Sequence, residues 1–158
     1  MYLVAQKLIN QACKIIVIQA ENPDGDSLGS ALALEEILSV LGKEVKLYCP
    51  VEIPKYLRYI DGWDRVESDF STDADLVIIV DTTAELLLSK VLETPGARHF
   101  LESREVLVID HHTNATPDLF FKNELILEEA SSAGELIFEI AKANRWEINE
   151  NAAQNLLG

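Results

Sequence analysis

Residues 15–42 read IIVIQAENPDGDSLGSALALEEILSVLG, and this stretch decides the fold. It opens on a β-branched run at 15–18 that shows no alternation of polar and apolar residues, which is typical of a parallel strand covered on both faces. A polar loop follows. The spacing of the apolar residues in 26–41 then predicts a helix that ends at Gly42. A buried strand, a loop and a helix in this order predict the first unit of an α/β fold with a parallel sheet.

Strands and helices alternate in the same way along the rest of the chain. Short apolar runs predict further buried strands, and helical spacing of apolar residues predicts the helices between them. The expected strands lie at 45–49, 76–80 and 106–109, and the expected helices at 2–12, 85–92, 131–144 and 149–157, with a short helix and turn at 53–66. We therefore expect one domain over residues 1–158, an α/β fold in which helices cover both faces of a parallel sheet.

Composition narrows the function classes. Asp and Glu number 27 against 13 Lys and Arg, so the formal net charge of -14 argues against a binding surface for long duplex nucleic acid. No apolar run approaches the roughly 18 residues that span a membrane, so we expect a cytoplasmic protein without membrane association. Cys13 and Cys49 lack the spacing of a zinc or redox site, and we expect both to be buried. A small phosphorylated ligand stays compatible with this charge, because divalent cations held by carboxylates reverse the local field.

Three of the predicted strands end in acidic or imidazole side chains. Asp24 and Asp26 lie in the loop after the first strand, Asp81 follows the strand at 76–80, and Asp-His-His at 110–112 follows the next one. The carboxyl ends of parallel strands meet at one edge of a sheet, where ligands bind. Carboxylates and imidazoles without thiolates favour Mn²⁺ or Mg²⁺, so the sequence predicts a divalent-metal site at this edge.

Each of these features also has a purely structural explanation. The segment 24–30 can form an Asx-type turn that caps a helix, and Asp81 can cap the helix that follows it. The pair His111 and His112 is harder to explain in this way, because adjacent histidines at a strand end have no routine packing role. The recurrence of such residues at successive strand ends favours a functional site.

Four segments together resemble the DHH superfamily of phosphoesterases, and most of all its branch of nanoRNases and pAp phosphatases. The segments are Asn-Pro-Asp-Gly-Asp-Ser-Leu-Gly-Ser at 22–30, Val-Asp-Thr at 80–82, Asp-His-His at 110–112 and Ser-Ser-Ala-Gly-Glu at 131–135. RecJ-type exonucleases are more distant relatives. The resemblance implies hydrolysis of phosphodiester or phosphomonoester bonds in a short oligonucleotide or a small nucleotide such as pAp. Many members of the superfamily self-associate, which leaves a homodimer open.

The resemblance also implies a role for each residue. In this family two Mn²⁺ ions activate a bridging water for attack on phosphorus. Asp24 binds one ion, Asp26 the other, and Asp81 bridges them, while Asp110 orients His111 and His112 contacts the scissile phosphate. The metal ligands implied in this way are Asp24, Asp26, Asp81 and His111. The implied catalytic residues are Asp110, His111 and His112, and the implied substrate-binding residues are His112, Ser132 and Gly134.

The sequence departs from the family pattern in two places. The first motif of the family begins with a histidine three residues before the proline, and here that position is Ala20. Glu21 or Gln19 could supply the missing ligand, although Glu21 can equally be a solvated loop charge. Relatives also continue, after a helix like 149–157, into a strand with another metal-binding aspartate and then a substrate-binding domain, whereas this sequence stops at Gly158.

These departures lower the expected metal content. We expect a DHH catalytic domain truncated before its last metal-binding motif, without the C-terminal substrate-binding domain, and with one ion or none instead of two. Loss of an outer ligand weakens metal binding strongly. An alternative function is therefore a catalytically impaired module that binds a phosphorylated ligand or regulates another protein.

Overall fold

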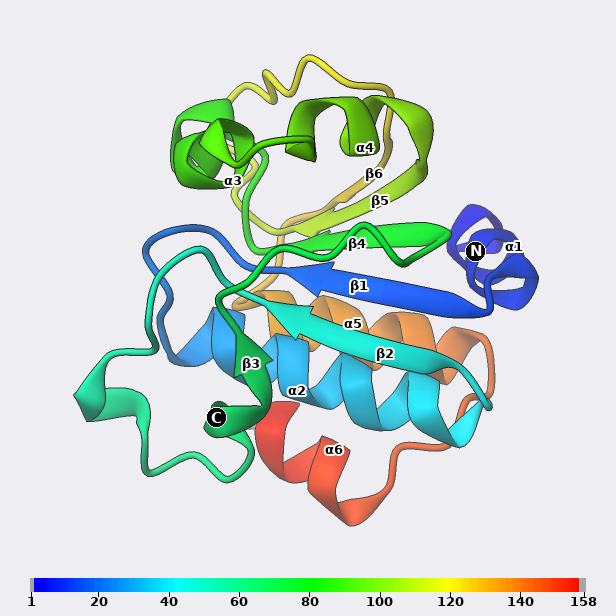
Figure 1. The fold of residues 1–158 in the computed structure, drawn as a ribbon. Coiled ribbons are helices and arrows are strands. Elements are labelled where there is room, and N and C mark those ends of the chain that lie inside the picture. Colours follow the sequence, from blue (N-terminus) through cyan, green and yellow to red (C-terminus); the bar gives the residue numbers. More distant parts are fainter. Residues whose placement is uncertain (1, 157–158) are drawn as a thin grey trace.

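The structure of the protein, a computed structural model, describes residues 2–156. Within this range the strands form one sheet in the order β3-β2-β1-β4-β5-β6, and each neighbouring pair is parallel (Figure 1). The strands are β1 (Lys14–Ile18), β2 (Glu44–Tyr48), β3 (Val66–Glu67), β4 (Leu76–Val80), β5 (Glu105–Asp110) and β6 (Glu124–Leu127). The predicted parallel sheet is confirmed.

Helices cover both faces of the sheet, as predicted: α2, α5 and α6 lie on one side, and α3 and α4 lie on the other (Figure 1). The α-helices are α1 (Leu3–Gln11), α2 (Gly25–Val40), α3 (Ser89–Glu93), α4 (Ala97–Ser103), α5 (Ala133–Ala143) and α6 (Glu150–Leu156). Short 3₁₀ turns are η1 (Lys55–Leu57), η2 (Trp63–Arg65) and η3 (Glu85–Leu88). Among the helices of residues 2–156, none is both long and apolar enough to cross a membrane.

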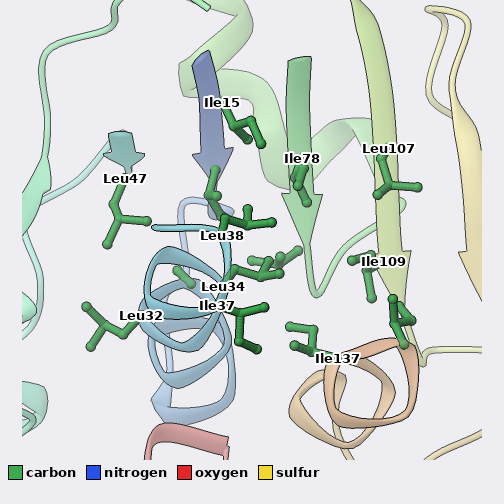
Figure 2. Packing of buried hydrophobic residues seen from close by; sticks show 14 of the residues in the cluster. Ile15, Leu32, Leu34, Ile37, Leu38, Leu47, Ile78, Leu107, Ile109 and Ile137 are labelled. Carbon is green, nitrogen blue, oxygen red and sulfur yellow. The ribbon is translucent and has the colours of Figure 1, made fainter. Parts of the chain in front are cut away.

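The β4 strand shows why these unbroken apolar runs form the centre of the sheet. Successive side chains of a strand point to opposite faces. Ile78 and Val80 pack into the core beneath α2, whereas Val77 and Ile79 pack into a second core beneath α3 and α4. Figure 2 shows the first core, in which Ile78 lies among side chains of the neighbouring strands and of α2. Both faces exclude water, so a polar residue has no exposed side to occupy until the strand ends.

The structure adds elements that the sequence analysis did not predict. α4 follows the turn at Gly96, and its buried residues Ala97, Phe100 and Leu101 have helical spacing. β6 is a four-residue edge strand whose residues are only half-buried or exposed, so its sequence lacks the signature of a buried strand. The predicted helix at 85–92 begins as the 3₁₀ turn η3 before α3, and the segment 53–66 forms η1, η2 and the start of β3.

Two further expectations need comment. Cys49 is buried as predicted, but Cys13 is exposed, because it lies at the turn between α1 and β1 instead of within the core. The predicted helix at 149–157 is confirmed as α6 up to Leu156, and residue 157 lies outside the described part of the chain.

The strand order places a crevice between β1 and β4. From β1 the chain moves outward to β2 and β3, and then returns to form β4 on the other side of β1. The loops that leave two such strands diverge and open a crevice at their carboxyl ends, where ligands bind in open α/β sheets. β1 ends at Ile18 and β4 at Val80, so the loops carrying Asp24 and Asp81 leave the sheet at this point.

Candidate metal centre

Asp24 begins helix α2 and is fixed by a reciprocal pair of hydrogen bonds. The backbone N–H of Ser27 donates to Asp24 Oδ1 at 2.8 Å, and the backbone N–H of Asp24 donates to the Ser27 hydroxyl at 3.0 Å. This capping box satisfies N–H groups that a helix start leaves without partners. The structural role considered for this loop is therefore present, but it uses only one oxygen of the Asp24 carboxylate.

Gln19 is fully buried and contacts Ser27, the other residue of this capping box. Its Oε1 accepts a hydrogen bond from the Ser27 hydroxyl at 3.0 Å. Its Nε2 is also buried and has no hydrogen-bond partner among the described residues. Gln19 therefore contacts the loop of Asp24 without acting as a ligand itself.

Asp26 reaches from α2 to the start of α5, 107 positions further along the chain. The backbone N–H of Ala133 donates to Asp26 Oδ2 at 2.9 Å, and that of Gly134 donates to Oδ1 at 3.1 Å. A carboxylate at a helix N-terminus is stabilised by these free N–H groups and by the helix dipole. A Cβ at position 134 would lie 3.1 Å from the backbone oxygen of Leu156, so glycine allows this close packing.

Ser132 and Gly134, the residues predicted to bind substrate, form hydrogen bonds with other residues of the protein at the start of α5. Ser132 caps α5, because its hydroxyl accepts a hydrogen bond from the Glu135 backbone N–H at 3.1 Å. The Gly134 N–H is engaged by Asp26. Contacts of Ser132 and Gly134 with substrate stay a prediction.

Asp81 follows β4 in a left-handed backbone conformation, with φ of 67°. Its Oδ1 is buried, lies 3.2 Å from His111 Nε2, and has no hydrogen-bond partner among the described residues. Burial and the nearby carboxylates of Asp26 and Asp24 raise the pKa of Asp81 to about 8, with His111 acting in the opposite direction. A carboxylate in this position needs a positive partner to stay ionised at neutral pH.

The imidazole of His111 presents a lone pair to these carboxylates. His111 Nδ1 lies 3.2 Å from the backbone oxygen of Ala130, which can only accept a hydrogen bond. The proton of the neutral ring is therefore on Nδ1, and Nε2 faces Asp81 Oδ1 at 3.2 Å and Asp26 Oδ2 at 3.4 Å. A histidine that donates one ring N–H to a backbone carbonyl and exposes the other nitrogen has the arrangement of a metal ligand.

Asp110 organises the two histidines from within the core. It is fully buried, and its Oδ1 accepts a hydrogen bond from the His111 backbone N–H at 2.9 Å. The same oxygen lies 2.6 Å from His112 Nδ1. The side chain of His112 is 47% exposed, so Asp110 holds a ring whose other nitrogen is left for a ligand.

These side chains form a group that fits a divalent cation. One ligand atom from each of Asp81, Asp110, His111 and His112 lies within 4.8 Å of the others, and Asp26 joins the group through His111. His111 Nε2, Asp81 Oδ1 and Asp26 Oδ2 are atoms that can each donate an electron pair to a metal ion, and His111 Nε2 lies 3.2 Å from the first oxygen and 3.4 Å from the second. Nitrogen and carboxylate oxygen donors of this kind suit Mn²⁺ or Mg²⁺.

A cleft of about 250 Å³ opens beside this group and includes the predicted residue Asp24. Ala20 also lines the cleft, so its methyl group occupies the position where the family pattern has a histidine. Glu21 is not among the residues that line it. Asn22 and Thr82 of the motif segments also line the cleft, as do two polar residues outside those segments, Thr83 and Asn114. Both residues follow a motif closely in the sequence, since Thr83 lies two residues after Asp81 and Asn114 two residues after His112. This closeness to the motifs is the sequence feature that could have indicated them.

A larger cavity, of about 550 Å³, lies elsewhere between α2, α6 and the segment around Tyr59. It contains none of the predicted site residues, and its Glu35 already pairs with Arg65 at 2.7 Å. Its size alone does not make it the functional site, because none of its acidic residues joins the metal-binding group.

Comparison with solved structures supports the fold. An exopolyphosphatase-related protein from Bacteroides fragilis superimposes with a TM-score of 0.83 at 23% identity, covering 98% of this chain and 47% of that one. The structure of RecJ from Thermus thermophilus in complex with Mn²⁺ superimposes with a TM-score of 0.53 at 20% identity, covering 98% of this chain and 22% of that one.

Sequence comparison finds relatives with named activities. The chain is 28% identical over 145 residues to the bifunctional oligoribonuclease and PAP phosphatase NrnA of Bacillus subtilis, a match over 89% of this chain and 42% of the relative. It is 27% identical over 142 residues to a probable enzyme of the same name from Streptococcus mutans, over 90% of this chain and 43% of the relative. The chain thus spans less than half the length of either relative. The N-terminal domain of the DHH family matches residues 14–158, and the chain belongs to this family.

Proposed function

We propose that the protein is a metal-dependent phosphoesterase domain that hydrolyses phosphodiester or phosphomonoester bonds in short oligonucleotides or small nucleotides such as pAp. The observation that carries the proposal is the position of His111 Nε2, 3.2 Å from Asp81 Oδ1 and 3.4 Å from Asp26 Oδ2. Burial and the neighbouring carboxylates disfavour the ionised form of Asp81, and a bound cation would compensate its charge. The substrate class is carried over from the two relatives and from family membership.

In this proposal His111, Asp26 and Asp81 hold a Mn²⁺ or Mg²⁺ ion, and Asp24 contributes the oxygen that its capping box does not use. A divalent ion at this place supplies Lewis acidity toward a phosphoryl oxygen and toward water. The backbone N–H groups of Ala133 and Gly134 keep the Asp26 carboxylate at the edge of the site.

His112 is the residue of the chain that contacts the substrate phosphate in this proposal. Asp110 fixes the orientation of the ring through Nδ1, at 2.6 Å, and the ring stands half-exposed at the cleft. The cleft of about 250 Å³ is small beside the roughly 300–1,000 Å³ of typical ligand pockets. It therefore suits the scissile phosphate and its nearest neighbours more than a whole oligonucleotide.

The test is hydrolysis with and without Mn²⁺, measured as mononucleotide release from a diribonucleotide and as phosphate release from pAp. We expect His112→Ala to lower the rate by at least about 100-fold, the usual scale for loss of a positioned acid–base or phosphate-contacting group. His99→Ala is the matched control, because His99 is an exposed histidine on α4. Bound Mn²⁺ without any hydrolysis of either substrate would count against the proposal.

A second candidate function rests on Ala20. The side chain that lines the cleft at this position is a methyl group, so the site has one imidazole fewer than the family pattern. A site weakened in this way could bind a phosphorylated ligand and turn it over poorly. Ala20→His separates the two functions: activity that appears only in the variant favours a binding or regulatory module, whereas an active wild type excludes it.

A further inference from the structure

We infer that Gln19 is a positioning residue of the metal centre, which fixes the carboxylate of Asp24 by acting through the hydroxyl of Ser27. The inference rests on the proposed metal site but concerns a residue outside the ligand set. Gln19 is fully buried and its Oε1 is engaged by the Ser27 hydroxyl, so we expect any effect it has on a bound ion to pass through that side chain.

The contacts form a continuous chain from Gln19 to Asp24. Gln19 Oε1 accepts the hydroxyl hydrogen of Ser27 at 3.0 Å. The Ser27 oxygen then accepts the backbone N–H of Asp24 at 3.0 Å, and the Ser27 backbone N–H donates to Asp24 Oδ1 at 2.8 Å. Both the backbone and the side chain of Asp24 are held by one serine, and Gln19 sets the direction in which that serine points.

The hydroxyl of Ser27 has a competing acceptor, which is why Gln19 matters. The backbone oxygen of Asp24 lies 3.3 Å from the same hydroxyl, further than Gln19 Oε1 at 3.0 Å. Without Gln19 we expect the hydroxyl hydrogen to turn toward the backbone oxygen of Asp24, which redirects the lone pair that receives the Asp24 N–H. The loop would then keep its fold, but the carboxylate of Asp24 would no longer be held in one orientation.

Gln19 is also poorly suited to its place if stability is its only purpose. The residue is fully buried, and its Nε2 has no partner among the described residues. An unpaired buried amide group costs free energy that an apolar side chain of the same length would not. The backbone N–H of Gln19 donates to Tyr48 O at 3.0 Å, so β2 holds the main chain of the residue in place, and full burial confines its side chain. Nε2 makes no hydrogen bond and Oε1 accepts one from Ser27, so we infer that the role of the Gln19 side chain is to supply this acceptor.

The experiment measures the affinity for Mn²⁺ alone by titration calorimetry, and the melting temperature of the metal-free protein. Gln19→Met keeps the length of the side chain and removes the acceptor. We expect this variant to bind Mn²⁺ about tenfold more weakly, as for loss of other residues that orient a ligand. We also expect its metal-free melting temperature to be unchanged or higher, because the unpaired amide is gone. A purely structural role predicts no such separation of affinity from stability.

Two variants and a control complete the test. Gln19→Glu keeps an acceptor for Ser27 and should retain the wild-type affinity within about threefold, even where the buried charge lowers the melting temperature. Ser27→Ala should weaken binding like Gln19→Met, and the double variant should be no weaker than either single one, because both remove the same connection. Gln154→Met makes the same substitution on α6, away from the metal centre, and should change neither quantity.

The outcomes separate this inference from the proposed function. Wild-type affinity in Gln19→Met overturns the positioning role and leaves the metal site intact. Independent, additive losses in Gln19→Met and Ser27→Ala also overturn it. Absence of Mn²⁺ binding in the wild type overturns both the positioning role and the proposed phosphoesterase.

Discussion

Asp81 shows how a residue of the site can act against the stability of the fold. Burial, and then the carboxylates of Asp26 and Asp24, raise its pKa from 3.8 to about 8. Well below pH 3.8 the carboxyl group is protonated in both the folded and the unfolded chain. As the pH rises toward 8 the unfolded chain ionises first, so the free energy of unfolding falls across this window, by up to about 4 kcal/mol at pH 7.

We therefore predict that Asp81→Asn stabilises the metal-free protein at pH 7, by on the order of 2 kcal/mol. Asparagine has the same shape, and it tolerates the left-handed conformation that Asp81 adopts, with φ of 67°. The measurement is denaturant unfolding in the presence of a chelator at pH 4 and at pH 7. The gain should be much smaller at pH 4, and an equal gain at both values would show that the charge is not its cause. The same variant should lose affinity for Mn²⁺.

At the scale of elements, the packing of α2 against α6 depends on one glycine. A Cβ built at Gly29 would lie 2.6 Å from the backbone oxygen of Asn155, a distance that no rotation of a side chain can relieve. α2 is buried against the sheet, α5 and α6, so the helix cannot move away from this contact without opening another. The close approach of the two helices therefore requires glycine at position 29.

We predict that Gly29→Ala lowers the free energy of unfolding by about 1–3 kcal/mol, the usual cost of overpacking in a core. Alanine is otherwise the better helix former, so any loss reports the clash with Asn155. Gly25→Ala is the control on the same helix, because a Cβ there meets nothing within 4 Å. The measurement is urea unfolding of both variants, and equal midpoints for the two would contradict the contact seen between α2 and α6.

At the scale of the whole molecule, the sequence predicted best the strands whose two faces are both buried. β4 has the predicted bounds 76–80, because a central parallel strand must be apolar on both faces. The motifs at the strand ends could be placed at one edge by topology alone. The position of β6 could not be predicted, since a short, partly exposed edge strand has a weak pattern. The contact of Asp26 with Ala133 and the burial of Gln19 under the Asp24 loop were also out of reach, because they depend on how distant segments pack.

The net charge of -14 makes cation binding a property of the whole molecule as well as of one site. We predict that Mn²⁺ raises the melting temperature with saturation, since an ion that binds only the folded chain stabilises it by about 2.7 kcal/mol at 100 times the dissociation constant. For a chain of this length that corresponds to roughly 5–10 °C. Screening of surface charge is different, because it depends on ionic strength and shows no saturation at one site.

His111→Ala distinguishes these two effects in thermal unfolding with Mn²⁺ and with NaCl at equal ionic strength. His111 Nε2 lies within 3.4 Å of both Asp26 and Asp81, so the variant removes the ligand that joins the two carboxylates while the net charge stays the same. The rise produced by Mn²⁺ should fall to the small rise that NaCl gives the wild type. If the variant keeps the full response to Mn²⁺, the ion acts on the acidic surface in general, and the group around His111 is not its site.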